Sequence, residues 1–128
     1  MSMTHKTVLE QANAAIRAGD LEVFLQFCTD DTVWTFVGDR TLRGKDAVRD
    51  YLADAYRVLP RFSVHRMVAE GDVVTAIGEI TLTDDQGQQT HHDYCDVWRF
   101  RDGKLAELQA FVIQTPVAGR DVSGPDQG

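Results

Sequence analysis

The sequence predicts an α+β fold in which three helices cover one face of a curved, antiparallel sheet. Two observations support this prediction. Apolar residues recur at helical spacing through most of the first 59 residues, with one β-rich stretch at 33–37. After Pro60, β-branched and aromatic stretches alternate with short turn signals up to residue 115. Helices followed by a strand meander form an α+β layout, and the space between the two layers is a natural cavity.

Each predicted helix combines an apolar stripe with a start or stop signal. The first covers 4–17, where Thr4 can cap the start, and Asp20 can cap a short second helix. The third covers 45–59 and is stopped by Pro60. The three stripes are Val8, Leu9, Ala12, Ala15 and Ile16; then Leu21, Phe24, Leu25 and Cys28; then Val48, Leu52, Ala55, Tyr56 and Leu59.

The strands follow from β-rich stretches between turn residues. The early strand at 33–37 has a predicted turn before it, at 29–31, and a polar loop after it, up to residue 44. Later strands are predicted at 62–70, 73–83, 89–101 and 105–115. We expect a single domain over 1–115 and a mobile tail over 116–128, which contains three glycines and few apolar residues.

The composition disfavours several classes of partner. The 128 residues fit one domain with a core, and 13 basic against 20 acidic residues give a net charge of −7. This balance disfavours nucleic acids and anionic membranes, which both require a basic patch. No stretch resembles a secretory signal or a membrane span, so we expect a cytoplasmic protein. Cys28 and Cys95 lie far apart and are expected to be free thiols.

Asp96 is the candidate catalytic residue. It shares a strand face with Tyr94, Trp98 and Phe100. A carboxylate on an aromatic face is costly unless it is paired, protonated or used in chemistry. Burial there would raise its pKa toward the range of a general acid or base. The alternative is a structural aspartate held by hydrogen bonds to a tyrosine, a histidine or a backbone amide.

The turn at Asp102-Gly103 admits two registers for the last hairpin. A two-residue loop places Asp96 opposite Gln109, whereas a three-residue loop with a bulge places it opposite Leu108. We prefer the bulge, because it gathers apolar residues of the last strand on the face of Asp96. These residues are Ala106, Leu108, Ala110 and Val112.

The histidines are ambiguous. His91 and His92 are adjacent and point to opposite faces, so His92 shares the face of Asp96, roughly 13 Å along the strand. The alternative for His92 is an exposed position at the strand end. His65 could pair with Asp96 if it points inward, but alternation leaves its face undecided. No histidine or acidic pair shows metal-ligand spacing, so no metal is expected.

Aromatic side chains on the predicted concave faces suit a flat, mostly apolar small molecule, with ordinary core packing as the alternative. There is no nucleophile motif and no glycine-rich phosphate loop, so no cofactor is expected. The candidate ligand-binding residues are Trp34, Phe36, Tyr51, Tyr56, His65, His92, Tyr94, Trp98, Leu108 and Ala110.

Four short motifs occur in an order that resembles the nuclear-transport-factor-2-like superfamily, in particular its SnoaL-like polyketide cyclases and ketosteroid-isomerase-like proteins. They are Ala18-Gly19-Asp20-Leu21, Asp30-Asp31-Thr32-Val33, Arg43-Gly44-Lys45-Asp46-Ala47-Val48, and Asp96-Val97-Trp98-Arg99-Phe100 followed by Asp102-Gly103-Lys104. The resemblance covers residues 4–115. It implies a cone-shaped fold, with a curved antiparallel-rich sheet wrapped by three N-terminal helices, that is often dimeric through its outer sheet face. Because this fold hosts isomerases, cyclases, dehydratases, epoxide hydrolases and non-catalytic subunits, it does not imply one activity.

The resemblance argues against ketosteroid isomerisation by the known mechanism. The place of the catalytic base falls at Thr35 or Phe36, that of the oxyanion tyrosine at Ala12, and that of its supporting tyrosine at Leu52, next to Tyr51. Only the second oxyanion donor, a protonated aspartic acid, has a counterpart, Asp96. In SnoaL-like cyclases an acidic residue on the sheet acts as acid or base, and Asp96 matches that role.

The leading hypothesis is therefore a homodimeric, cofactor-independent enzyme that acts on an apolar or aromatic compound by isomerase, cyclase, dehydratase or hydrolase chemistry. The alternative is a non-catalytic ligand-binding or accessory protein with the same fold.

Overall fold

A computed structural model describes residues 4–116 and confirms the predicted α+β class. In chain order the elements are α1 (His5–Arg17), α2 (Leu21–Gln26), β1 (Cys28–Phe36), β2 (Arg40–Arg43), α3 (Lys45–Ala55), β3 (Arg61–Glu70), β4 (Val73–Thr83), β5 (Gln89–Arg101) and β6 (Lys104–Thr115). Except for Pro116, the predicted tail lies outside the described residues.

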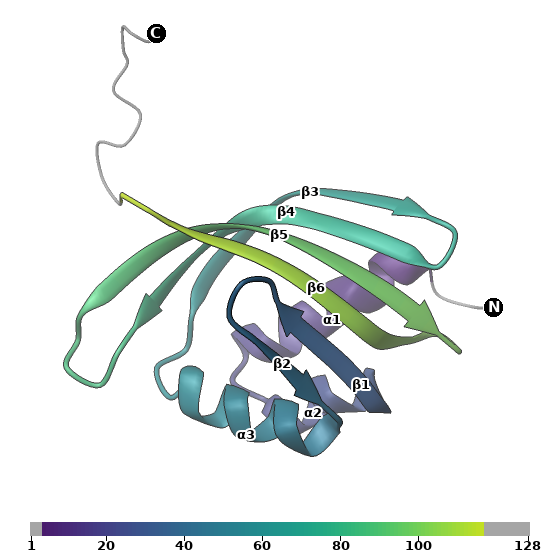
Figure 1. Cartoon of the computed structure of the whole chain (residues 1–128), viewed down its shortest axis with the longest axis horizontal. Coiled ribbons are helices and arrows are strands. Elements are labelled where there is room, and N and C mark those ends of the chain that lie inside the picture. Colours follow the sequence, from purple (N-terminus) through teal and green to yellow (C-terminus); the bar gives the residue numbers. More distant parts are fainter. Residues whose placement is uncertain (1–3, 117–128) are drawn as a thin grey trace, which may run out of the picture.

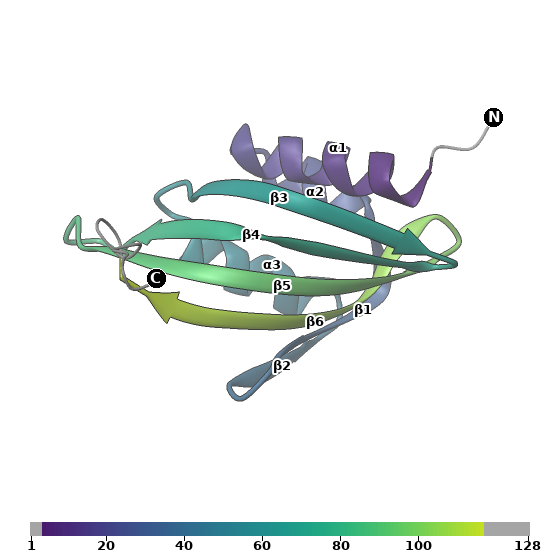
Figure 2. The ribbon, with the colours of Figure 1, turned by 90° about the horizontal axis from the view of Figure 1, so that it is seen from above.

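The strands form one curved, mixed sheet in the order β2-β1-β6-β5-β4-β3. The β1–β6 pair is parallel, and every other pair is antiparallel. The sheet arches over the helices, with α3 below the opening of the arch (Figure 1). From above, α1 runs along β3 at one edge of the sheet (Figure 2). This arrangement confirms the predicted sheet wrapped by N-terminal helices.

The helix starts agree with the predicted caps. The Thr4 hydroxyl accepts a hydrogen bond from the Thr7 amide at 3.1 Å, and the Asp20 carboxylate accepts one from the Val23 amide at 3.2 Å. The predicted stripe of α1 is buried throughout. However, α3 ends at Ala55 rather than at Leu59. The residue before a proline disfavours helical geometry, so the chain leaves the helix before Pro60 and runs toward β3.

Two predicted loops in the first half were wrong. The predicted turn at 29–31 belongs to β1, where Asp30 contacts Lys45 at 3.2 Å and Asp31 contacts Arg101. These acidic side chains face solvent from an irregular part of the strand. The predicted polar loop contains β2, which pairs with β1 at the edge of the sheet. Edge strands expose polar residues, so the composition of β2 resembles that of a loop.

The last hairpin combines a two-residue loop with a bulge. Asp102 and Gly103 both have positive φ, 55° and 76°, as a tight hairpin loop requires. The register then shifts by one residue next to Phe100, which places Asp96 opposite Ala110. Both predicted partners, Gln109 and Leu108, were therefore wrong.

Three of the four residues predicted on the inward face of β6 nevertheless lie there, whereas Ala106 is the extra residue of the bulge. Leu108, Ala110 and Val112 all line the concave side together with Asp96. The bulge is tied to β1 by the buried Thr32 hydroxyl, which lies 3.1 Å from the carbonyl oxygens of both Leu105 and Ala106. This contact satisfies backbone acceptors where the β6 ladder is irregular.

Cys28 is among the most deeply buried residues of the core, at the start of β1 and beside Leu105 of β6. Both cysteines are free, as predicted, and Cys95 is only partly buried. Burial raises the pKa of the Cys28 thiol to about 12.

Gly78 allows two neighbours to approach β4 closely. A Cβ atom at this position would lie 2.1 Å from the Ser63 carbonyl oxygen and 2.7 Å from the Tyr94 hydroxyl oxygen. Gly78 pairs directly with Tyr94, and β3 carries a bulge just beyond it, between Val64 and Arg66. Tyr94 therefore leans over a position where no other residue type fits.

We predict that Gly78→Ala lowers the free energy of unfolding by about 1–3 kcal/mol, because the added methyl group collides with a backbone oxygen that cannot rotate away. Urea denaturation measures this change. Thr83→Ala, at the end of the same strand, is the control and should cost less than about 1 kcal/mol. Equal losses in the two variants would contradict the close approach at Gly78.

Candidate functional site

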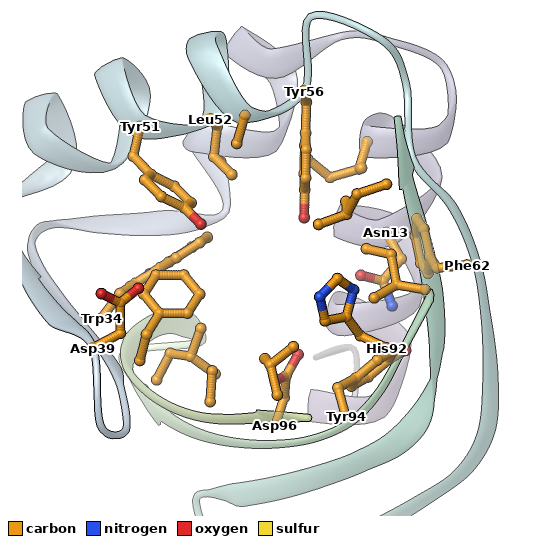
Figure 3. A pocket seen from close by; sticks show the side chains of 18 of the residues that line it. Asn13, Trp34, Asp39, Tyr51, Leu52, Tyr56, Phe62, His92, Tyr94 and Asp96 are labelled. Carbon is orange, nitrogen blue, oxygen red and sulfur yellow. The ribbon is translucent and has the colours of Figure 1, made fainter. Parts of the chain in front are cut away.

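A cavity of about 420 Å³ lies between the helices and the concave face of the sheet. Figure 3 shows side chains of α3 entering it from one side and those of β5 from the other. The residues that line it are Asn13, Ile16, Phe24, Trp34, Phe36, Val37, Asp39, Tyr51, Leu52, Ala55, Tyr56, Phe62, Ile80, Leu82, His92, Tyr94, Asp96, Trp98, Leu108, Ala110, Val112 and Gln114. Most are apolar or aromatic, as is usual for small-molecule sites.

The structure brings together all but one of the residues predicted for this site. β1 contributes Trp34 and Phe36, and β5 contributes Asp96 and the residues that alternate with it. The indole rings of Trp34 and Trp98 meet edge to face, with centroids 5.4 Å apart. The predicted residues that line the cavity are Trp34, Phe36, Tyr51, Tyr56, His92, Tyr94, Asp96, Trp98, Leu108 and Ala110. Their roles in binding and catalysis remain predictions.

Asp96 projects into the cavity from the middle of β5 (Figure 3). Its neighbours across the sheet are Ala76 on β4 and Ala110 on β6, and Phe36 follows Ala110 in the same row. Because alanine side chains are short, they neither cover the carboxyl group nor offer it a hydrogen bond. Burial alone raises the pKa of Asp96 to about 7, and no partner within residues 4–116 offsets this.

Two tyrosines share the electrostatic environment of Asp96. The Tyr56 hydroxyl enters the cavity from the helix side, and Tyr94 lies on the same strand as Asp96 (Figure 3). Burial, followed by the negative charge of Asp96, raises the pKa of both phenols, that of Tyr94 to about 12. Both phenols therefore remain protonated near neutral pH and can donate hydrogen bonds to a ligand oxygen.

His92 lies on the cavity wall farther along β5, as predicted from its shared face with Asp96. Burial, and then the neighbouring His91, lower the pKa of His92. Its Nδ1 atom is buried without a hydrogen-bond partner in the described part of the chain. His92 therefore contributes a neutral imidazole to the cavity at neutral pH.

His65 does not belong to this cavity, which corrects its place among the candidate ligand-binding residues. It is the extra residue at the β3 bulge, and its exposed ring points to the outer face, 2.9 Å from Glu79. It therefore does not pair with Asp96. The bulge interrupts the alternation of β3, so alternation could not decide which face His65 occupies.

The expectation of no metal considered only spacing along the sequence, and it stays a prediction. Glu79, His91 and Asp93 bring one ligand atom each within 4.8 Å of one another on the outer face of the sheet. Glu79 comes from β4 and the other two from β5. Spacing within one stretch of sequence cannot show such a cluster.

Sequence reasoning missed several polar residues of the cavity. Asn13 lies on α1, four residues after buried Leu9 and three before buried Ile16. A lone amide at the edge of an apolar stripe is the signal that could have identified it. Asp39 and Gln114 also line the cavity, and nothing in their local sequence distinguished them from exposed polar residues.

Comparison with known families now identifies the class of protein. The family described as the SnoaL-like domain matches residues 9–108, and the chain belongs to this family. This confirms the resemblance inferred from the four motifs. No protein with a curated description matches the sequence.

Similar solved structures share the nuclear-transport-factor-2-like fold. The epoxide hydrolase/cyclase-like enzyme SalBIII, with a role in pyran ring formation in polyether salinomycin, has a TM-score of 0.78 and 17% identity, covering 84% of this chain and 89% of that chain. An LEH-like epoxide hydrolase of M. tuberculosis has a TM-score of 0.74 and 21% identity, covering 83% and 80%. TerC, co-crystallised with polyporic acid, has a TM-score of 0.72 and 22% identity, covering 84% and 89%. At these identities the likeness establishes the fold alone.

The helices within residues 4–116 lack the length and hydropathy that a membrane crossing requires.

We predict that Asp96→Asn stabilises the protein at pH 8 but not at pH 4. An aspartate titrates near 3.9 in the unfolded chain and at about 7 here, so ionisation opposes folding as the pH rises between these values. The penalty is absent below pH 4 and complete above pH 7, where it is on the order of a few kcal/mol. Urea denaturation of both proteins across this pH range measures it.

Glu107→Gln, on the outer face of neighbouring β6, is the control and should keep the pH dependence of the wild type. An NMR titration of the Asp96 carboxyl carbon provides a direct check. A midpoint near 4 would rule out the desolvated carboxyl group.

Proposed function

We propose that the protein is a cofactor-independent SnoaL-like enzyme that uses Asp96 as a general acid or base on an apolar or aromatic small molecule. The main support is the position of the Asp96 carboxyl group, which faces a largely apolar cavity and has only alanines beside it in the sheet. Membership of the SnoaL-like domain family supports this proposal at the family level.

The ionisation of Asp96 suits proton transfer in both directions. With a pKa of about 7, the protonated and ionised forms coexist near neutral pH. A catalytic group with a pKa near the working pH combines a useful population of each form with adequate driving force. The ionised form can remove a proton from carbon or activate a water molecule, and the protonated form can return the proton to a neighbouring atom.

The tyrosines would stabilise charge that develops on the substrate. Tyr56 and Tyr94 hold their protons and lie close enough to Asp96 to respond to its charge. A substrate carbonyl or epoxide oxygen between them could accept hydrogen bonds as it becomes negative. This division assigns Asp96 to proton transfer and the two phenols to oxygen stabilisation.

The cavity sets the substrate class. Its volume of about 420 Å³ is at the lower end of the range for small-molecule sites. Trp34, Phe36 and Trp98 provide flat apolar walls, and the described lining contains no Lys or Arg to bind a phosphate. We therefore propose a ketone or epoxide with an aromatic or alicyclic skeleton.

The proposal predicts proton exchange that depends on Asp96. A panel of aromatic and alicyclic ketones and epoxides is first screened by thermal shift, and binders are then incubated in D₂O. Mass spectrometry detects incorporation of deuterium, gain or loss of water, or isomerisation. Asp96→Asn should lower the rate by about 10²–10⁴-fold while the thermal shift by the same compound persists.

Glu107→Gln is the matched control, because it neutralises a carboxylate outside the cavity, and it should retain the wild-type rate. Stabilisation of the wild type by a compound that never reacts would instead support a non-catalytic ligand-binding protein. A reaction that proceeds equally well in Asp96→Asn would contradict the proposed role of this residue.

We also propose a homodimer through the outer face of the sheet. Ile77, Cys95 and Phe111 form one row across β4, β5 and β6 on that face. Ile77, Phe111 and Ile113 are exposed, Ile113 at 66%. Apolar side chains gathered on one face are typical of a contact surface.

Phe111→Arg is expected to convert the dimer into a monomer, because it places a charge in the middle of that row. Sedimentation velocity at micromolar concentration measures the change. Val58→Arg, at an exposed apolar position away from the sheet, is the control and should remain dimeric. A wild type that sediments as a monomer would contradict the dimer.

A further inference from the structure

We propose that the outer face of the sheet carries a zinc-type metal site formed by Glu79, His91 and Asp93, with His65 beside it against Glu79. This site lies on the opposite side of β5 from the cavity and does not depend on the proposed enzymatic function.

The backbone places these side chains together. His91 and Asp93 are two residues apart on β5 and therefore project from the same face, away from His92 on the cavity wall. Glu79 is the direct partner of Asp93 on β4. One ligand atom from each lies within 4.8 Å of the other two. The β3 bulge places His65 next to the cluster, where its Nε2 atom lies 2.9 Å from Glu79 Oε2.

The surroundings of His91 match those of a metal-binding histidine. Its side chain is buried, its Nδ1 atom lies 2.9 Å from the Thr115 hydroxyl, and its Nε2 atom lies 2.7 Å from Glu79 Oε1. Histidine ligands usually donate a hydrogen bond from the ring nitrogen that does not bind the metal. In the metal-free protein a proton on Nε2 can join this nitrogen to the Glu79 carboxylate, with the Thr115 hydroxyl donating to Nδ1. In the other tautomer Nδ1–H donates to Thr115, and the Nε2 lone pair and the carboxylate oxygen can bind one cation between them.

The distances leave a metal ion within easy reach. Zinc binds histidine nitrogen and carboxylate oxygen at about 2.0–2.2 Å, so tetrahedral ligands are separated by roughly 3–3.5 Å. The ligand atoms of Glu79, His91 and Asp93 lie within 4.8 Å of one another, so small side-chain movements would bring them to this spacing. An imidazole with two carboxylates favours zinc, cobalt or nickel over magnesium.

Bound metal would connect neighbouring strands. Glu79 belongs to β4, His91 and Asp93 belong to β5, and Thr115 links His91 to β6. The ion would therefore crosslink the sheet at the end of β5 that lies beyond His92. We assign it a structural role, because the site lies outside the cavity and joins neighbouring strands of the sheet.

The test uses the full chain without a histidine tag, treated with EDTA and then freed of it. Isothermal titration with ZnCl₂ should show one site per chain, and saturating zinc should raise the Tm by several degrees. Co²⁺ should give the visible absorption of a tetrahedral site. Both His91→Gln and Asp93→Asn should weaken zinc binding at least 10-fold, and His65→Gln should weaken it less.

His92→Gln is the matched control, because it removes the adjacent imidazole on the opposite face, and it should bind zinc as the wild type does. Circular dichroism checks that each variant is folded, and Asp93→Asn decides the question if His91→Gln is not. The proposal is overturned if the wild type shows no saturable site, if folded Asp93→Asn binds zinc normally, or if His92→Gln loses as much affinity as His91→Gln.

Discussion

The position of β6 between β1 and β5 is the constraint on which the concave face depends. Its parallel pairing with β1 and antiparallel pairing with β5 align Trp34, Leu108 and Trp98 in one row, and Phe36, Ala110 and Asp96 in the next. A tight loop fixes one end of this alignment, and a bulge tied to Thr32 shifts it by one residue. Without that shift Asp96 would face Gln109, whose amide could reach it. The pairing register of β5 and β6 therefore leaves the Asp96 carboxyl group without a polar neighbour in the sheet.

Folding tolerates the cost of this isolated carboxyl group because the surrounding core is large. The aromatic contacts of Trp34 with Phe24 and Trp98 pack the apolar wall of the cavity on the side of Asp96 that faces β1. A buried ionisable group without a partner is typical of functional sites, where pKa values are displaced toward neutral pH. Gly78 contributes to the same arrangement, since it leaves room for the Tyr94 ring against β4.

The class of fold, the helix caps and most of the cavity wall could be predicted from the sequence, because they follow from local periodicity and capping chemistry. Prediction from the sequence failed where two distant segments decide the outcome. Asp30 and Asp31 resembled a turn because their cationic partners, Lys45 and Arg101, lie elsewhere in the chain. The partner of Asp96 depended on a bulge in β6, and the position of His65 on a bulge in β3. Bulges change alternation without a distinct residue signature.

Chemical labelling of Cys28 can report how often β1 and β6 separate. The thiol is fully buried at the junction of β1 and β6, and its pKa of about 12 keeps the nucleophilic thiolate scarce. Alkylating reagents can reach it only when that junction separates, whereas the partly buried Cys95 lies outside the core. The rate at which Cys28 becomes labelled therefore records how often the two halves of the sheet part, with no engineered probe.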